Sequence, residues 1–558
     1  MQAREEIYAR QAKETTPRRL ESVAANVNLA HSALTLNAQD RSKIALVWES
    51  ESGARKVFSF FEIEQLSNRI ANVFAAHGAE YGDRIFTLLG RTPTLYAAIP
   101  AVLKLGAAVG VLFTDFGSEA IRQRLEDSAA KILLTDAGNL EKILEIRRQL
   151  PFLETVFVVG EFSPENLPET NIKFRRFEPL IENASAEFAP AQVSPDDTCF
   201  LIYTSGTTGL PKGVVHRHAI RERLIESAKD VLQLQKSDFY WCSADPGWVT
   251  GLLYGTFAPW LLGMPILIYE GDFDAQKWLE ILERNQVTCF YTTPTLLRLM
   301  RNEIGDISPP RAFALRRIYS VGEPLNPEVL SWAERTFQAG VFDNYWQTET
   351  GTFVVANRPG IAVKKGSMGK AVKGVQVAII DERGRELPAG EIGDIAVRPT
   401  LSSLFKGYWN FPEATRACFR SGWYVTRDRG KRDEDDYFWF VARNDDVITC
   451  EAQRIGPFEI ENALLSHPAV AESAAIGVAD AVTTEHVKSL VVLRHGFAPS
   501  QALANEIATH ILAQISPLAA PREIEFCTDL PKTKSGKIKR NQLRRKMSLD
   551  ASKVFIIK

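Results

Sequence analysis

The sequence contains the stretch Tyr203-Thr204-Ser205-Gly206-Thr207-Thr208-Gly209-Leu210-Pro211-Lys212-Gly213, which combines three glycines, four serine or threonine hydroxyls and a lysine. It follows the apolar run Cys199-Phe200-Leu201-Ile202-Tyr203, which predicts a buried strand. Glycines let a backbone approach a ligand closely, and hydroxyls with a lysine suit phosphate oxygens. The stretch is not a Walker loop, because it lacks Gly-Lys-Ser/Thr at the required spacing. Taken alone, it is equally compatible with a phosphate-binding loop and with a mobile surface loop.

Length and composition indicate an ordinary globular protein of more than one domain. The chain has 558 residues, too many for a single hydrophobic core. Hydrophobic residues make up 45% and charged residues 24%, and the net charge is −2. This balance gives no reason to expect nucleic acid or an acidic membrane surface as a partner. Basic residues concentrate between Lys532 and Lys546, which indicates either a solvated tail or contact with a polyanionic ligand.

Cysteine usage and the first residues bear on the cellular compartment. The six cysteines are scattered and show no zinc spacing, as expected for buried thiols in a reducing compartment. The segment Met1-Gln2-Ala3-Arg4-Glu5-Glu6 is charged and has no apolar core, so no signal peptide is indicated. We therefore expect a cytoplasmic protein.

Residues 246–269 carry no charge and are long enough to span a bilayer. Three prolines and four glycines interrupt them, which favours a loop, a short buried helix and a strand at Ile266-Leu267-Ile268-Tyr269. We therefore expect a core segment and no membrane span.

Hydrophobic periodicity predicts an α/β fold. Helical patterns at 59–77, 95–105, 219–232 and 275–284 alternate with strand patterns at 84–89, 131–135 and 287–291, which indicates parallel-rich sheets. Short strands with Gly/Asp turns between 373 and 445 predict a small antiparallel subdomain. A new α+β unit begins after Asp445-Asp446.

Further motifs follow the first in order. They are Ser320-Val321-Gly322-Glu323-Pro324, Asp343-Asn344-Tyr345-Trp346-Gln347-Thr348-Glu349-Thr350-Gly351, Trp423-Tyr424-Val425-Thr426-Arg427-Asp428, Arg443-Asn444-Asp445-Asp446, Gln453-Arg454-Ile455-Gly456-Pro457-Phe458-Glu459 and Leu530-Pro531-Lys532-Thr533-Lys534-Ser535-Gly536-Lys537. Together they resemble the adenylate-forming superfamily from about residue 25 to about residue 545. With Trp241-Cys242-Ser243-Ala244-Asp245-Pro246-Gly247-Trp248-Val249-Thr250-Gly251, the chain is most similar to AMP-forming acetyl-CoA synthetases.

The resemblance implies two-step chemistry in two domains. A carboxylate attacks the α-phosphate of ATP to give an acyl-adenylate, and coenzyme A then displaces AMP. Residues 1–444 would form the adenylation domain and residues 445–558 a mobile domain that rotates about Asp445. Lys537 matches the catalytic lysine, whose charge lies between the two reacting anions. By position alone, Lys537 is one more lysine of a basic tail.

The resemblance also assigns the remaining site residues. Glu349 would bind Mg²⁺, a cation that prefers oxygen ligands, and Thr204 would act in catalysis. A structural cation would lie at Leu465, His467 and Val470, although a lone histidine more often serves as polar packing. The ATP site would comprise Thr204, Ser205, Gly206, Thr207, Thr208, Lys212, Gly322, Glu323, Pro324, Asp343, Asn344, Tyr345, Trp346, Gln347, Thr348, Asp428, Arg443 and Arg454.

Trp346 matches the tryptophan that closes the acyl pocket in acetyl-CoA synthetases, and Val249, Thr250 and Val321 match the other walls. The resemblance thus implies acetate or propionate as substrate. The alternative interpretation of Trp346 is core packing.

The sequence departs from the family at three positions that usually carry glycine, now Arg427, Ala442 and Ala452. Glu451 and Ala452 match the tunnel for the pantetheine arm of coenzyme A, where a β-carbon would narrow the passage and backbone strain could cost about 1 kcal/mol. Two alternatives therefore stay open: a ligase for another small acid or another thiol, and a catalytically weakened nucleotide-binding paralogue. The resemblance also predicts control by acetylation of Lys537, whereas nothing in the sequence indicates the oligomeric state.

Overall fold

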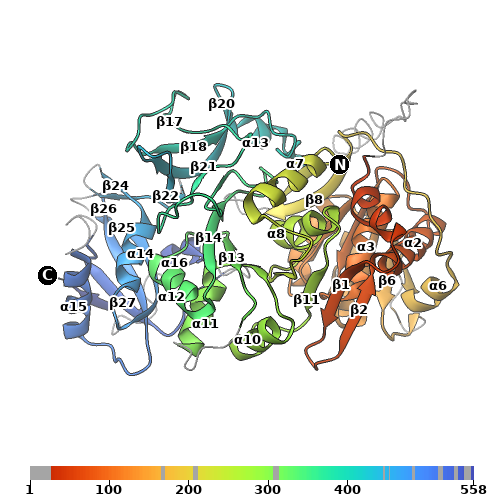
Figure 1. Cartoon of the computed structure of the whole chain (residues 1–558), viewed down its shortest axis with the longest axis horizontal. Coiled ribbons are helices and arrows are strands. Elements are labelled where there is room, and N and C mark those ends of the chain that lie inside the picture. The colour runs from red at the N-terminus through yellow and green to blue at the C-terminus, as the bar shows by residue number, and fades with distance from the viewer. Residues whose placement is uncertain are drawn as a thin grey trace.

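The computed structural model describes residues 27–164, 167, 170–204, 211–305, 313–443, 446–450, 453–480, 484–512, 520–532, 538–545 and 554–557. These residues form four β-sheets (Figure 1). The first sheet has nine strands in the order β16 (Lys370–Ala371), β15 (Val355–Ala356), β14 (Gly340–Tyr345), β13 (Arg317–Val321), β12 (Cys289–Thr292), β10 (Tyr240–Cys242), β11 (Ile266–Tyr269), β1 (Ile44–Glu49) and β2 (Arg55–Ser59). From β14 to β1 its neighbouring strands are parallel.

The second sheet has the same parallel-rich character. Its eight strands run in the order β19 (Gly407–Tyr408), β9 (Lys212–Arg217), β8 (Thr198–Thr204), β4 (Ala108–Val111), β3 (Arg84–Leu88), β5 (Ile132–Asp136), β6 (Thr155–Val159) and β7 (Lys173–Arg176). Strands β8 and β9 form an antiparallel hairpin that pairs Thr204 with Lys212. The strand predicted before the glycine-rich stretch is therefore confirmed as β8.

The two large sheets share a core. Helices α2 (Phe60–Ala76) and α3 (Pro93–Lys104) contribute to it together with residues from both sheets, among them Leu46 of β1 and Phe200 of β8. The next residue of β1, Val47, belongs to a second core, with α10 (Ala275–Arg284), α11 (Pro294–Ile304) and α12 (Pro327–Phe337). Because successive side chains of a strand point to opposite faces, β1 is buried on both sides. Helix α2 begins at a capping box in which Ser59 and Glu62 satisfy each other's backbone donors.

The uncharged segment 246–269 lies mainly in the first core, while Leu267 and Tyr269 belong to the second. It forms α8 (Val249–Leu252), a π-helical turn at Leu253–Phe257, α9 (Ala258–Leu261) and strand β11. Nearly all of these side chains are buried, as the sequence predicts. No helix among the described residues has the length and apolar character that a membrane crossing needs.

Two smaller sheets follow in the chain. The third is antiparallel and contains β17 (Val377–Ile380), β18 (Gly393–Val397), β20 (Phe419–Arg420), β21 (Trp423–Arg432) and β22 (Phe438–Arg443). The fourth contains β23 (Ile448–Cys450), β24 (Gln453–Ile455), β25 (Val470–Asp480), β26 (Thr484–Leu493), β27 (Glu523–Cys527) and β28 (Val554–Ile556). Both the antiparallel subdomain and the later α+β unit are thus present, while the boundary at residues 444 and 445 lies outside the described residues and stays a prediction.

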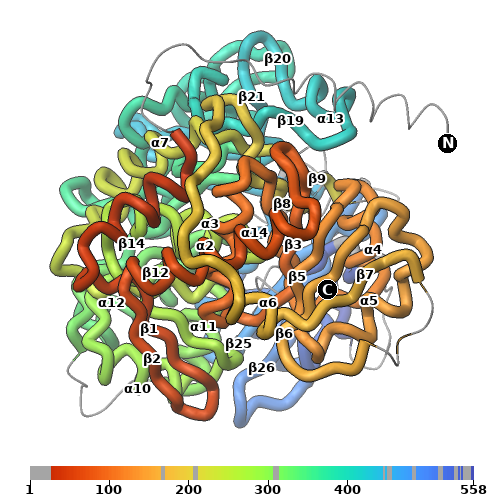
Figure 2. Tube along the Cα trace, turned by 90° about the vertical axis from the view of Figure 1, so that its right-hand side faces the viewer, coloured from red at the N-terminus to blue at the C-terminus, as the bar shows by residue number. Residues whose placement is uncertain are grey.

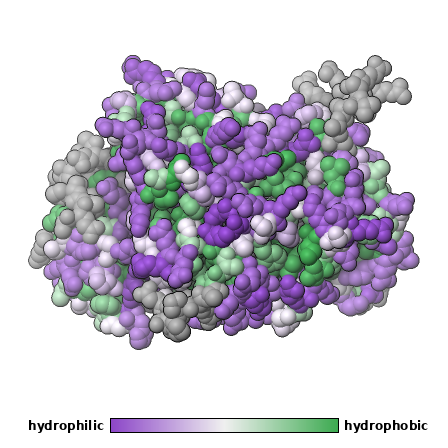
Figure 3. All heavy atoms as spheres, viewed as in Figure 1, coloured by the Kyte–Doolittle hydropathy of each residue, from purple (hydrophilic) through white to green (hydrophobic). Residues whose placement is uncertain are grey.

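The C-terminal sheet packs beside the first sheet through helix α14 (Pro457–Leu465) (Figures 1 and 2). Asn326, which caps α12, donates a hydrogen bond to Asn462 Oδ1 of α14 at 2.7 Å. The visible outer face in this orientation is mainly hydrophilic, with apolar atoms in separate small areas (Figure 3). The predicted motifs meet between the C-terminal sheet and the first sheet.

Candidate active site

A large cleft of about 1390 Å³ lies where the first three sheets and the C-terminal sheet meet. It collects most of the site residues predicted from the sequence. Those lining it are Thr204, Lys212, Val249, Thr250, Val321, Gly322, Glu323, Pro324, Asp343, Asn344, Tyr345, Trp346, Gln347, Thr348, Glu349, Asp428, Arg443 and Leu465. Residues more than 200 positions apart in the sequence thus form one site.

Several predicted residues lie outside the part of the chain that the structure describes. They are Ser205, Gly206, Thr207, Thr208, Asp445, Glu451, Ala452 and Lys537, together with the side chain of Arg454. Their roles stay predictions. The residues that follow Lys537, namely Ile538, Lys539 and Arg540, do line the cleft.

One end of the cleft combines a lysine, a carboxylate and a tyrosine. The Tyr408 hydroxyl donates to Glu349 Oε1 at 2.6 Å, and Lys212 Nζ lies 5.4 Å from the centre of the Tyr408 ring. Among the described residues no other hydrogen bond to the Glu349 carboxylate is found, and a carboxylate is the type of ligand that Mg²⁺ prefers. His216 contacts the residue that precedes Glu349. Burial lowers the pKa of its imidazole to about 4, and the neutral ring contacts the Thr348 carbonyl through Nε2 at 2.7 Å.

The middle of the cleft holds Asp428 in a hydrogen-bond network. Tyr345 donates to Asp428 Oδ2 at 2.7 Å and Gln347 Nε2 donates to the same oxygen at 2.6 Å. Arg443 Nε lies 3.8 Å from Asp428 Oδ1. The carboxylate is thereby fixed as a hydrogen-bond acceptor, which suits paired hydroxyls such as those of a ribose.

A buried carboxyl group marks the third region. Asp343, in β14, is 5% exposed, and burial raises its pKa to about 7 despite the hydrogen bond from Ser320. Gly322 closes the neighbouring turn with φ +96°, a conformation that favours glycine. Beside it, Thr295 donates to both oxygens of Glu323.

Aromatic residues enclose the apolar end of the cleft. Trp346 is 7% exposed, and its ring meets those of Tyr254 and Phe353 edge-on with centroids 5.2 and 5.9 Å away. Its indole nitrogen donates to the Tyr291 hydroxyl at 3.3 Å. Trp346 therefore fits both interpretations, core packing and pocket wall, because its ring packs in the core and also lines the cleft.

The predicted structural cation site lies in the turn between α14 and β25. His467 is buried, its Nδ1 accepts a hydrogen bond from Ala469 N at 3.2 Å, and its Nε2 lies 3.4 Å from Glu506 Oε1. Both ring nitrogens of His467 thus contact other groups of the protein. Among the described residues no group of three His, Cys, Asp or Glu side chains could hold a metal ion.

Two of the three positions that usually carry glycine lie in the described residues, and the replacements there have different consequences, while Ala452 lies outside them. Arg427 has φ +63°, so a side chain is strained there. Ala442 is buried in β22, and its φ is not positive, so its β-carbon adds no such strain.

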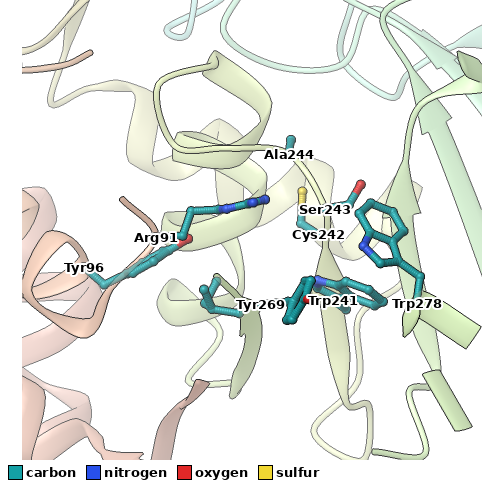
Figure 4. Close-up of a pocket in the computed structure, with 9 residues that line it drawn as sticks. Arg91, Tyr96, Trp241, Cys242, Ser243, Ala244, Tyr269 and Trp278 are labelled. Atoms are coloured by element: carbon teal, nitrogen blue, oxygen red, sulfur yellow. The ribbon is translucent and has the colours of Figure 1, made fainter. Parts of the chain in front are cut away.

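Sequence reasoning missed Tyr408 and Tyr424, which hold Glu349 and Gln347 respectively. Tyr424 lies within one of the quoted motifs, whereas nothing in the sequence around Tyr408 indicates a contact with Glu349. A separate cavity of about 10 Å³ beside Cys242 was also not foreseen, and there Arg91 extends toward Cys242 and Ala244 (Figure 4). Its size suits no more than a water molecule.

Two family models match this chain. Residues 34–409 match the family model described as AMP-binding enzyme, and residues 459–537 match that of the AMP-binding enzyme C-terminal domain. The chain is 40% identical over 523 residues to an acetyl-coenzyme A synthetase of Bacillus subtilis (strain 168), covering 93% of this chain and 90% of the relative.

Two solved structures show the same fold. A Brucella canis acyl-CoA synthetase is 36% identical, with a TM-score of 0.71 and coverage of 93% of this chain and 94% of that one. The anthranilate CoA ligase AuaEII in complex with anthranoyl-AMP is 28% identical, with a TM-score of 0.85 and coverage of 96% and 99%.

Proposed function

Since this chain belongs to the family of AMP-binding enzymes, we propose that it joins acetate or propionate to coenzyme A. The chain is an AMP-forming acid–CoA ligase that uses ATP, Mg²⁺ and coenzyme A. The identity of the acid is the proposed part of this function. The observation that carries it is the tryptophan at the apolar end of the cleft, held in place by aromatic rings and a hydrogen bond.

The pocket geometry supports a short acid for a physical reason. Val249, Thr250 and Val321 are buried and line the cleft with Trp346, so a longer alkyl chain would have to displace the indole. That displacement would break the bond to Tyr291 and the ring contacts, and interiors are too densely packed to absorb such a change.

The remaining residues suit the nucleotide. Asp343 would accept a hydrogen bond from the adenine amino group, Asp428 would accept from the ribose hydroxyls, and Lys212 would hold phosphate oxygens. Glu349 fits Mg²⁺, which is usually bound by one or two carboxylates together with substrate phosphates. When bound, Mg²⁺ neutralises charge on the phosphates. Lys537 would supply positive charge where the acid attacks the α-phosphate.

Two assays test this proposal. Exchange of labelled pyrophosphate into ATP, dependent on the added acid, measures the first half-reaction, and thioester formation with coenzyme A measures the second. We expect acetate or propionate to support both. Exchange without thioester formation would indicate another thiol acceptor, and the absence of both with either acid would overturn the proposal.

A further inference from the structure

Arg427 lies in a bulge of strand β21. Asp394 of β18 pairs with Arg429 and Ala396 pairs with Val425, so only Ile395 lies opposite the three residues between them. Thr426 fixes the bulge, because its hydroxyl donates to Ile395 O at 2.8 Å and accepts from Asp428 N at 3.2 Å. Bulges of this kind redirect side chains next to active sites.

The backbone of Arg427 is strained, with φ +63°. Among the described residues, the other non-glycine residues with positive φ lie outside the named strands, at turns and helix ends: Ala129, Gln233, Gln286, Gln338, Asn410, Ser421 and Asp436. A glycine at position 427 would remove this strain. An arginine at this strained point of a cleft therefore suggests a function of its side chain.

Arg427 lies in the part of the cleft to which the proposed function assigns the phosphates. Arg427 is half-buried and lines the cleft with Lys212, Glu349 and Tyr408. Burial raises the pKa of the Cys418 thiol, and the charge of Arg427 partly offsets this rise, so the two side chains are close; Glu349 and Lys212 also act on this thiol. The guanidinium forms no hydrogen bond or ion pair with any residue that the structure describes. A half-buried guanidinium in this position is suited to an anionic ligand.

We propose that Arg427 binds the pyrophosphate end of ATP and the pyrophosphate that leaves. Guanidinium groups match phosphate oxygens with paired donors, which a lysine cannot do. Arg427 would thus add a second positive charge beside Lys212 and offset the charge of Glu349. This inference rests on the proposed use of this end of the cleft for phosphates.

The test is calorimetric titration of the whole enzyme with inorganic pyrophosphate and Mg²⁺, and separately with AMP. For Arg427→Gly we expect about a tenfold or greater rise in the Kd of pyrophosphate, the loss typical of a charged hydrogen bond. The Kd of AMP and the melting temperature should not worsen, because glycine suits this φ. Arg427→Lys should lie between the two. Pyrophosphate affinity of Arg427→Gly within about twofold of wild type would overturn the proposal.

Two control variants separate strain from charge. Asp436→Gly replaces another residue of positive φ, at +65°, in the turn between β21 and β22. Lys431→Ala removes an exposed charge from the same strand. Neither should change pyrophosphate affinity, and an equal loss in either control would also overturn the proposal. The titration uses no acid and no coenzyme A, so its outcome is independent of which acid the enzyme activates.

Discussion

The indole nitrogen of Trp346 donates a hydrogen bond to the Tyr291 hydroxyl at 3.3 Å, and that hydroxyl donates to Asn344 Oδ1 at 2.8 Å. An indole N–H only donates, so the Tyr291 oxygen must accept and its proton must go to Asn344. The order of donors and acceptors is therefore fixed. The acyl pocket ends at a side chain held by directional bonds as well as by packing.

Replacing Tyr291 with phenylalanine should loosen this pocket end. The change removes the partner that the described residues give to the Trp346 N–H and to Asn344 Oδ1, a loss of about 1–3 kcal/mol of stability. We expect a lower melting temperature and measurable exchange activity with four-carbon acids. Tyr319→Phe is the matched control, because it also removes a buried hydrogen bond, which the Tyr319 hydroxyl donates to Leu232 O at 2.8 Å. A control that broadens acid preference equally would show that the effect is not transmitted through Trp346.

Trp346→Gly should shift preference toward acids of four or more carbons. Removal of the indole opens room for several methylenes, each contributing roughly 1–3 kcal/mol of discrimination. Acetate should lose kcat/KM because it no longer fills the pocket. The measurement is kcat/KM for each acid in pyrophosphate exchange, and an unchanged profile would mean that Trp346 does not limit chain length.

Asp343→Asn should stabilise the protein at alkaline pH while weakening ATP binding. The pKa of Asp343 is raised from 3.8 to about 7 by burial, so the native state binds more protons than the unfolded state between these values. The wild type therefore loses stability as pH rises through that window, by roughly 4 kcal/mol at most, whereas the amide does not titrate.

Thermal unfolding of the wild type and of Asp343→Asn at about pH 5 and about pH 8 tests this pH dependence. The stability advantage of the variant should grow toward the higher pH. A difference that stays constant across this range would show that Asp343 does not titrate as described. The KM for ATP should rise in the variant, because the amide keeps one acceptor oxygen in place of two, and Ser320 already donates to this side chain.

Lys537→Ala should abolish adenylation and spare the second half-reaction. Loss of a positive charge placed at the transition state typically lowers the rate by about 10²–10³-fold or more. Thioester formation from supplied acyl-adenylate and coenzyme A should continue, because the proposed rotation removes Lys537 before the thiol arrives. Near wild-type formation of acyl-adenylate would contradict this role.

The sequence predicted the regular elements well. The bounds predicted for α10 and β11 match the structure, since hydrophobic patterns reflect local burial. The motif order also led to the residues that line the cleft. The choice between core packing and pocket wall for Trp346 could not be made from the sequence, because it depends on rings from three separate segments.

Other features depend on contacts between distant strands. The bulge at Arg427 arises where three residues of β21 lie opposite the single residue Ile395 of β18, and the Glu349 contact comes from Tyr408 of β19. No local pattern encodes either relationship. The replacement at Ala442, which looked equivalent to that at Arg427, adds no positive-φ strain, because only the structure distinguishes an extended backbone from a left-handed one.

The most direct test of the account is a competition among acids. The wild-type enzyme is given ATP, Mg²⁺, coenzyme A and an equimolar mixture of straight-chain acids of about two to eight carbons, and the acyl-CoA products are resolved by mass spectrometry. We expect acetyl-CoA and propionyl-CoA to make up nearly all of the product. A mixture dominated by thioesters of longer acids would contradict the central claim that Trp346 closes the acyl pocket.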